Sequence, residues 1–220
     1  MGTFYDQSII PAELRRSYDV YDRIKQLGID LGTFDQQVRS LQGRNIAGVV
    51  FHESGLVYLS GVGMGSRPMN DDPERVKHGQ EAARAAADAH IRTLHWALTC
   101  GGEGGDLNDV LYTIKALGMV VSTDVEFNSG PAVVNGYSFR WQSVFGGGTG
   151  EFAENGVDAG GYAGVHARSA IGGFTGRFSL EPEMIVAIPP ALAQAIIRNR
   201  GWVFPLPPPV YDKVVAARRT

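Results

Sequence analysis

The sequence predicts an α+β fold in which one mixed β-sheet is covered on one face by two helices. Three observations support this class. Apolar runs and periodic stretches follow one another in the order β-β-α-β-α-β-β, and the two longest helical patterns lie between strands. The chain has 220 residues, 44% apolar and 20% charged, which is enough for one domain with a core. The uncovered sheet face predicts self-association.

Residues 11–28 predict a polar helix that ends at Gly28, because apolar side chains recur there at steps of three and four. Residues 29–45 hold no clear element. We therefore expect residues 1–45 to form an N-terminal helix and an extended lead-in. The main domain is expected to span residues 46–188.

Two apolar runs, Ala47 to Phe51 and Leu56 to Ser60, are separated by four residues that include a glycine and predict a β-hairpin. After a loop with several glycines, residues 73–99 form the strongest helical pattern in the chain. Pro73 suits the first turn of a helix, and the stretch is rich in alanine, the best helix former.

Residues 109–121 predict a long buried strand, and residues 131–145 predict a second amphipathic helix. The glycine-rich stretch 146–165 is long for a loop in a compact domain, which is typical of a functional or mobile segment. Residues 167–174 and 184–188 are the last two strand candidates.

The C-terminal segment, residues 189–220, follows the last strand candidate. Pro189-Pro190 ends that strand, and residues 191–199 predict one short helix. The proline-rich tail beyond it is expected to be extended and to dock on a neighbouring surface.

Composition and charge exclude several classes of function. The net charge of -3 gives no basic surface for nucleic acid, and no apolar run approaches the ~18 residues of a membrane span. The start of the chain does not resemble a signal peptide. The single cysteine, Cys100, fits a reducing compartment, so we expect a cytoplasmic protein.

The sequence also predicts that no cofactor or metal is bound. The glycines of Gly61-Val62-Gly63-Met64-Gly65 are spaced wrongly for a dinucleotide loop, and no helix pattern opens directly after them. His90 and His95 are five residues apart on a helix, so they do not share one face.

The positive signal is Arg168, which enters an apolar strand pattern within His166-Ala167-Arg168-Ser169-Ala170-Ile171-Gly172. Burying an arginine is costly unless its guanidinium meets an anion, and its planar fork suits a carboxylate. Glu183 follows fifteen residues later, at the start of the next strand pattern. If those two strands pair, both side chains can face one cleft. On spacing alone, a structural salt bridge at a sheet edge is favoured over a catalytic pair.

Several short motifs, in order, resemble the Rid (RidA/YjgF) family. Residues 166–172 match the "HARSAvG" motif of its longer subgroup almost letter for letter. That subgroup includes 2-aminomuconate deaminases. The other matching segments, which bring the resemblance to roughly residues 20 to 188, are 23–31, 55–61, 79–84, 107–110 and 134–145.

This resemblance implies a chorismate-mutase-like fold and a homotrimer with clefts between subunits. Active Rid proteins hydrolyse enamines and imines to keto acids and ammonia without a cofactor. Arg168 stands at the place of the residue that binds the substrate carboxylate, and Glu183 at that of the acidic residue that handles water. Further substrate-binding positions are matched by Ser60, Gly61, Asn135 and Ser169.

The chain also departs from the family pattern. The family's common tyrosine is absent, because its position falls near Ile46 or Ala47 here. The family's glutamine after Ser60-Gly61 is replaced by Val62. Two hypotheses therefore stay open, a deaminase of a small carboxylate-bearing imine and a non-catalytic trimer that binds a small carboxylate. A ribonuclease, an older label of the family, is disfavoured because the chain lacks a basic run.

Overall fold

The computed structural model describes residues 10–42, 47–64, 74–122, 129–149, 153–154, 158–174 and 179–205. The strands are β1 (Val49–Phe51), β2 (Leu56–Leu59), β3 (Tyr112–Ser122), β4 (Ala167–Phe174), β5 (Ser179–Ala187) and β6 (Val203–Phe204). They form one sheet in the order β4-β3-β5-β2-β1-β6, in which only β3 and β4 are parallel neighbours. The helices are α1 (Val20–Gln26), α2 (Phe34–Gln42), α3 (Arg75–Thr99), α4 (Gly130–Phe145) and α5 (Pro190–Arg200), with 3₁₀ turns at Ala12–Leu14 and Leu107–Asp109.

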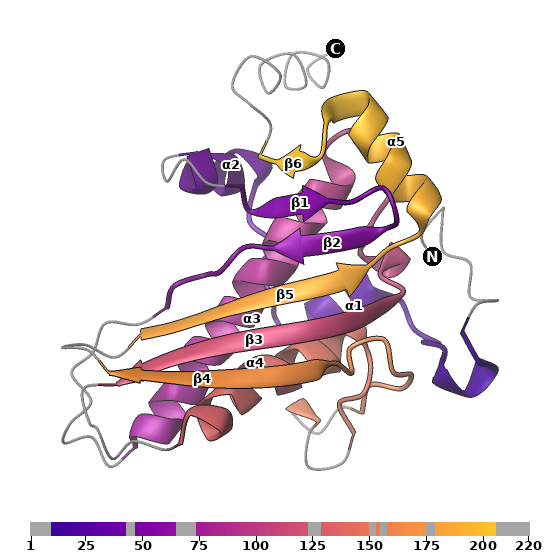
Figure 1. Cartoon of the computed structure of the whole chain (residues 1–220). Helices are drawn as coiled ribbons and strands as arrows, with labels where there is room; N and C mark the ends of the chain where they lie inside the picture. Colours follow the sequence, from indigo (N-terminus) through magenta and orange to yellow (C-terminus); the bar gives the residue numbers. More distant parts are fainter. Residues whose placement is uncertain are drawn as a thin grey trace.

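The helices α3 and α4 lie side by side against one face of the sheet, as Figure 1 shows from the opposite face. This arrangement confirms the predicted α+β class. The hairpin of β1 and β2 is confirmed as well, with Val49 paired to Leu59. β3 and β4 run parallel because α4 connects them, and parallel strands need such a crossover.

The contact between α3 and α4 depends on a glycine. A Cβ added at Gly136 would stand 2.2 Å from the backbone oxygen of Gln80 on α3. Trp141 and Tyr137 of α4 are fully buried, and their rings stack at 6.2 Å. The pair of helices is therefore closely packed, and small shifts of α4 are costly.

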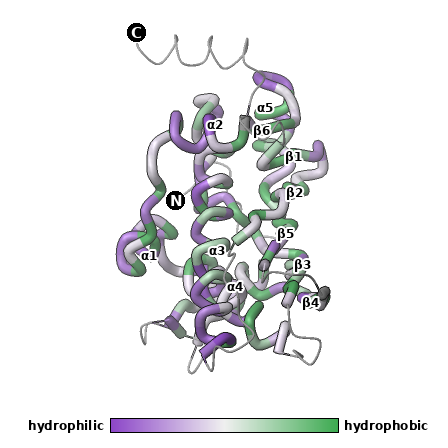
Figure 2. The backbone as a smooth tube through the Cα atoms, turned by 90° about the vertical axis from the view of Figure 1, so that its left-hand side faces the viewer, coloured by the Kyte–Doolittle hydropathy of each residue, from purple (hydrophilic) through white to green (hydrophobic). Residues whose placement is uncertain are grey.

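The N-terminal segment forms an additional layer outside α3 and α4. Edge-on, α1 lies on the side of these helices away from the sheet (Figure 2). The predicted helix over 11–28 is interrupted, because Asp19 caps a new helix start by accepting a hydrogen bond from Tyr21 N at 2.7 Å. Val20 is buried there, and its N–H donates to the Asn108 side chain at 2.9 Å.

The prediction that residues 29–45 hold no element is wrong, since α2 lies within them. Thr33 and Gln36 form reciprocal hydrogen bonds, with Gln36 N donating to Thr33 Oγ1 and Thr33 N donating to Gln36 Oε1. This pattern, Ser or Thr followed three residues later by Glu or Gln, is a sequence signature of a helix start. The signal was therefore present in the sequence, although no long apolar period accompanies it.

The C-terminal segment belongs to the same core and sheet. Leu192 of α5 and Phe204 of β6 are fully buried, and Phe204 pairs with Val49 on β1. β5 begins at Ser179, five residues earlier than predicted. The remaining tail beyond Pro205 and the helical turn expected at Thr123-Asp124 lie outside the described residues.

The second face of the sheet has no helix over it among the described elements. Large side chains on this face are exposed: Tyr58 by 41%, Tyr112 by 46% and Ile171 by 52%. Strand register places all three on one side. Tyr58 and Tyr112 pair with residues 185 and 187 of β5, and Ile171 aligns through β3 with residue 181, and these alternate positions of β5 share a face. Within the described part of the chain, no helix combines the length and apolarity needed to cross a membrane.

Candidate functional site

The candidate site is an open cavity of about 360 Å³ between α4 and the start of β4. Four lining residues come from α4 at positions 135, 138, 139 and 142, a spacing that places them on one helix face. His166 and Arg168 alternate along the strand side and so point the same way. The complete lining is Asn135, Ser138, Phe139, Gln142, Gly147, His166 and Arg168.

Arg168 points toward the helices. It pairs in register with Ala116, which is buried under α4 on the covered face of the sheet. Its Nη1 donates to Asn135 Oδ1 and lies 3.5 Å from Ser138 Oγ. Partial burial lowers the pKa of Arg168, but an arginine remains a cation near neutral pH. Among the described residues Arg168 makes no salt bridge to a carboxylate, so its charge is available to an anion in the cavity.

His166 connects the cavity to the preceding loop. Its Nδ1 lies 2.7 Å from the Gly164 carbonyl oxygen, and its Nε2 lies 3.1 Å from Ser138 Oγ. Burial lowers the pKa of His166, and the positive charge of Arg168 lowers it further. Neither His166 nor Ser138 was predicted as a site residue, although Ser138 is three positions after Asn135 on one helix and His166 two positions before Arg168.

Glu183 lies on the other face of the sheet. β4 and β5 do not pair, because β3 lies between them. Arg168 is in register with Ala116, whereas Glu183 is in register with Leu117, the next residue of β3. Two strand spacings separate β4 from β5, about 10 Å, and consecutive residues point to opposite faces. The expectation that Arg168 and Glu183 meet across paired strands, in a cleft or a salt bridge of one chain, is therefore wrong.

The remaining predicted residues divide between these two places. Asn135 lies beside Arg168 in the cavity. Ser169 shares the exposed face with Glu183, since both are in register with Leu117. Ser60 and Gly61 follow β2 and run alongside β5, where the next residue, Val62, donates its N–H to Pro182 O.

A buried histidine holds the position of Ser60. His90 Nε2 lies 2.8 Å from the Ser60 carbonyl oxygen, and its Nδ1 lies 2.6 Å from the Tyr137 hydroxyl. The carbonyl can only accept, so Nε2 carries the proton and the tyrosine donates to Nδ1. Burial lowers the pKa of His90 to about 4, which keeps this histidine neutral.

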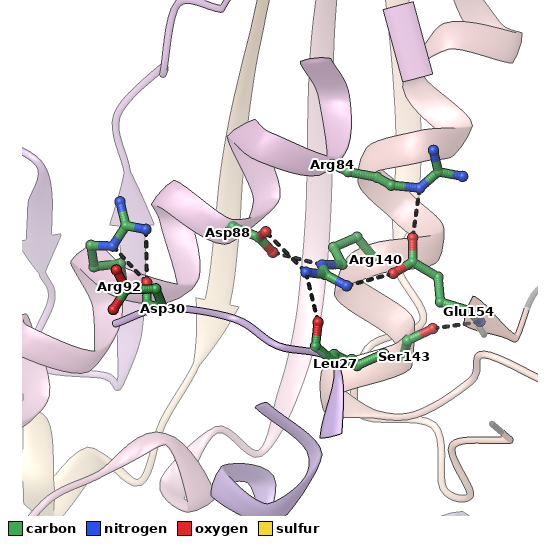
Figure 3. Close-up of polar contacts among 8 residues, drawn as sticks. All are labelled: Leu27, Asp30, Arg84, Asp88, Arg92, Arg140, Ser143 and Glu154. Atoms are coloured by element: carbon green, nitrogen blue, oxygen red, sulfur yellow. Dashed lines mark hydrogen bonds and ion pairs between the residues drawn. The ribbon is translucent and has the colours of Figure 1, made fainter. Parts of the chain in front are cut away.

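An ion-pair network outside the cavity ties Glu154, which follows α4 in the chain, to α3 and α4 (Figure 3). Arg140 on α4 pairs with Asp88 on α3 at 2.7 Å and with Glu154 at 2.9 Å, and it also donates to Leu27 O. Glu154 in turn pairs with Arg84. This cluster fastens Glu154 and the end of α1 onto α3 and α4. Nowhere among the described residues do three or more His, Cys, Asp or Glu side chains gather in a way that could hold a metal ion.

No protein-family model and no curated protein sequence matches this chain. Solved structures do match this chain. Atu1372 from Agrobacterium tumefaciens, a protein of unknown function, matches with a TM-score of 0.53 and 26% identity over 77% of this chain and 91% of its own. A "putative endoribonuclease" from Shewanella oneidensis MR-1 matches with a TM-score of 0.55 and 18% identity over 78% of this chain and 100% of its own.

A YjgF family member from Neisseria meningitidis, NMB1025, aligns less well, with a TM-score of 0.29 and 15% identity over 61% of this chain and 80% of its own. The first two likenesses show that the fold is shared with known structures. They assign no activity to this chain.

Proposed function

We propose that this protein is a Rid-type deaminase, which hydrolyses the imine or enamine of a small carboxylate-bearing molecule to a keto acid and ammonia. The observation that carries the proposal is Arg168, a cation in an open cavity that makes no salt bridge within the described residues. Its guanidinium can bind a carboxylate bidentately, and Asn135 holds it in place. The family resemblance of residues 166–172 and the shared fold support the same assignment.

The split between the two groups of site residues favours an assembly. Arg168 and Asn135 open at the β4 edge, whereas Glu183 and Ser60 lie along β5 and β2, on the other side of β3. Contact between the two groups therefore requires a second copy of the chain. The exposed apolar side chains on the uncovered sheet face would be buried in such an assembly. We propose a cytoplasmic homotrimer with a chorismate-mutase-like arrangement, with Glu183 and Ser60 contributed to the cleft by a neighbouring subunit.

The second candidate function is a non-catalytic trimer that binds a small carboxylate. It is favoured by the sequence around Ile46 and Ala47, which lacks the tyrosine common in active Rid proteins. Both functions require Arg168, so carboxylate binding does not separate them. The resemblance to the subgroup that includes 2-aminomuconate deaminases makes a dicarboxylic enamine one candidate substrate for the first function.

The test is hydrolysis of 2-iminopropanoate, generated in situ, by the wild type and by Arg168→Ala. Loss of a charge-assisted contact worth about 1.5–3 kcal/mol lowers kcat/KM by about 10- to 150-fold. The matched control is Arg198→Ala, an exposed arginine at the end of α5, which should hydrolyse the imine at the wild-type rate.

A wild type that is no faster than buffer, with this imine and with 2-aminomuconate, would refute the deaminase and leave the binding function. Pyruvate, the keto acid formed from 2-iminopropanoate, reports carboxylate binding. If the wild type and Arg168→Ala bind pyruvate equally well, Arg168 is not the carboxylate site. Light scattering tests the assembly, which should have three times the 23.7 kDa mass of one chain; a stable monomer would contradict the shared cleft.

A further inference from the structure

We propose that Ser138 and His166 are the proton-transfer pair of the Arg168 cavity, with the Ser138 hydroxyl contacting the attacking water and His166 taking its proton. This inference rests on the proposed function, because it assigns the base for that hydrolysis. It differs from the family expectation, in which the acidic residue at position 183 handles the water.

The hydrogen bonds fix the tautomer of His166. The Gly164 carbonyl oxygen, 2.7 Å from Nδ1, can only accept, so Nδ1 carries the proton. Nε2 is then an acceptor, and the Ser138 hydroxyl donates to it across 3.1 Å. This is the arrangement of a hydroxyl next to a base that is itself oriented by a third group.

The cavity gives the pair access to a substrate. Ser138 and His166 both line it, together with Arg168, whose Nη1 lies 3.5 Å from Ser138 Oγ. The hydroxyl oxygen keeps lone pairs that can accept a proton from a water. A carboxylate held by Arg168 therefore places the adjacent carbon, the imine carbon of a 2-imino acid, next to this hydroxyl.

The surroundings keep His166 in the basic form. Burial lowers the pKa of His166, the Gly164 carbonyl opposes this shift, and the charge of Arg168 adds to it. These groups come from the loop before β4 and from β4 itself, and α4 contributes the uncharged Ser138. A neutral imidazole can take a proton at neutral pH, which an already protonated one cannot.

Glu183 cannot fill this role within the same chain. It points from the exposed face of the sheet, with β3 between its strand and the strand of Arg168. Ser138 and His166 are the groups that one subunit itself brings to its arginine, whatever a neighbouring subunit adds.

The reaction balances with this pair alone. The water oxygen forms a bond to the iminium carbon, the C=N π electrons move to nitrogen, and the water proton passes through the Ser138 hydroxyl to His166 Nε2. His166 then returns the proton to the amine nitrogen. The C–N bond then breaks, and its electron pair leaves on nitrogen. The carbonyl forms as the hydroxyl group on the substrate carbon gives its proton to ammonia, which leaves as ammonium. An iminium ion and one water become a keto acid and one ammonium ion.

A purely structural role makes different predictions. In that case His166 and Ser138 would only shape the start of β4, and their loss would weaken carboxylate binding or stability without changing the pH dependence. The chain offers a matched control, the exposed pair of His52 and Ser54 in the turn between β1 and β2, whose Nδ1 and Oγ lie 2.8 Å apart.

The experiment compares Ser138→Ala and His166→Gln with His52→Gln and Ser54→Ala. For the first two we expect kcat for 2-iminopropanoate to fall by about 100-fold or more, with KM and pyruvate affinity nearly unchanged. The acidic limb of the wild-type kcat–pH profile should disappear in His166→Gln. The control pair should keep the wild-type rate and profile.

Three results would overturn the inference. The first is a wild-type kcat and acidic limb in both Ser138→Ala and His166→Gln, while Arg168→Ala is impaired; this leaves the proposed function intact. The second is a Nε2–H tautomer of His166 in NMR spectra of histidine-labelled protein. The third is a wild type without imine hydrolysis, which removes the proposed function and this inference together. If His166→Gln fails to fold, Ser138→Ala removes the same hydrogen bond by deleting one oxygen atom.

Discussion

Replacing Gly136 with alanine should force α3 and α4 apart and disturb the cavity at the same time. The added Cβ would stand 2.2 Å from the Gln80 carbonyl oxygen and 2.7 Å from the Gln80 Cα, whereas ordinary contact begins at 3.4 Å. The obstacle is helix backbone, which cannot rotate away as a side chain can. One helix must therefore shift by roughly the difference between the 2.2 Å approach and the 3.4 Å at which ordinary contact begins.

The size of the effect follows from two opposing contributions. Overpacking of this kind costs about 1–3 kcal/mol, and the upper end applies here because the obstacle is rigid. Alanine is favoured over glycine within a helix by about 1 kcal/mol, which offsets part of this cost. The net loss of about 2 kcal/mol corresponds to a fall in Tm of about 4–8 °C for a chain of this size.

Thermal unfolding followed by circular dichroism measures this fall. Gly63→Ala is the matched control, because an added Cβ there meets nothing within 4 Å, and its Tm should stay close to that of the wild type. Asn135 and Ser138 flank Gly136 on α4, so pyruvate binding at the cavity should weaken as well. A Tm of Gly136→Ala equal to or above the wild-type value would show that the helix contact is not as tight as we describe.

Two further predictions concern charge. Burial holds the pKa of His90 at about 4, below its ordinary 6.5, so the unfolded chain takes up this proton first as the pH falls. The neutral His90 therefore contributes its full share of the free energy of unfolding above pH 6.5, and roughly 3 kcal/mol of it is lost as the pH falls to 4. The Tm measured across this range should fall, and it should fall less in His90→Gln. Arg140→Leu leaves Asp88 without this partner in a largely buried network and should cost about 3–5 kcal/mol in urea unfolding. Lys77→Ala, at an exposed pair with Glu74, is the control and should change stability by at most about 0.5 kcal/mol; equal effects of the two substitutions would contradict the structural role of the network.

Local patterns were enough to predict most of the elements. Helical periodicity and alanine content predicted α3, and the apolar runs around a four-residue turn predicted β1 and β2. These patterns are readable because each depends on side chains a few residues apart. The helix α2 was missed because its signal is a capping pattern at Thr33 and Gln36 rather than a long apolar period.

Strand order was less accessible. The helix α4 between β3 and β4 indicates a crossover and a parallel pair, so the sequence contained a reason to place β4 beside β3. The prediction considered instead that β4 pairs with β5, the next strand in the chain. That pairing would have brought Arg168 and Glu183 together, whereas the observed order puts β3 between them.

The sequence by itself determined most of the helices and strands, and it singled out Arg168, because a guanidinium that is taken out of water needs an anionic partner. Only the tertiary structure decided what surrounds it. The Ser138–His166 contact joins residues 28 positions apart on a helix and a strand, and the face on which Glu183 lies depends on strand register, where a shift of one residue reverses every side chain. Such relations are set by packing over the whole domain, which no local pattern encodes.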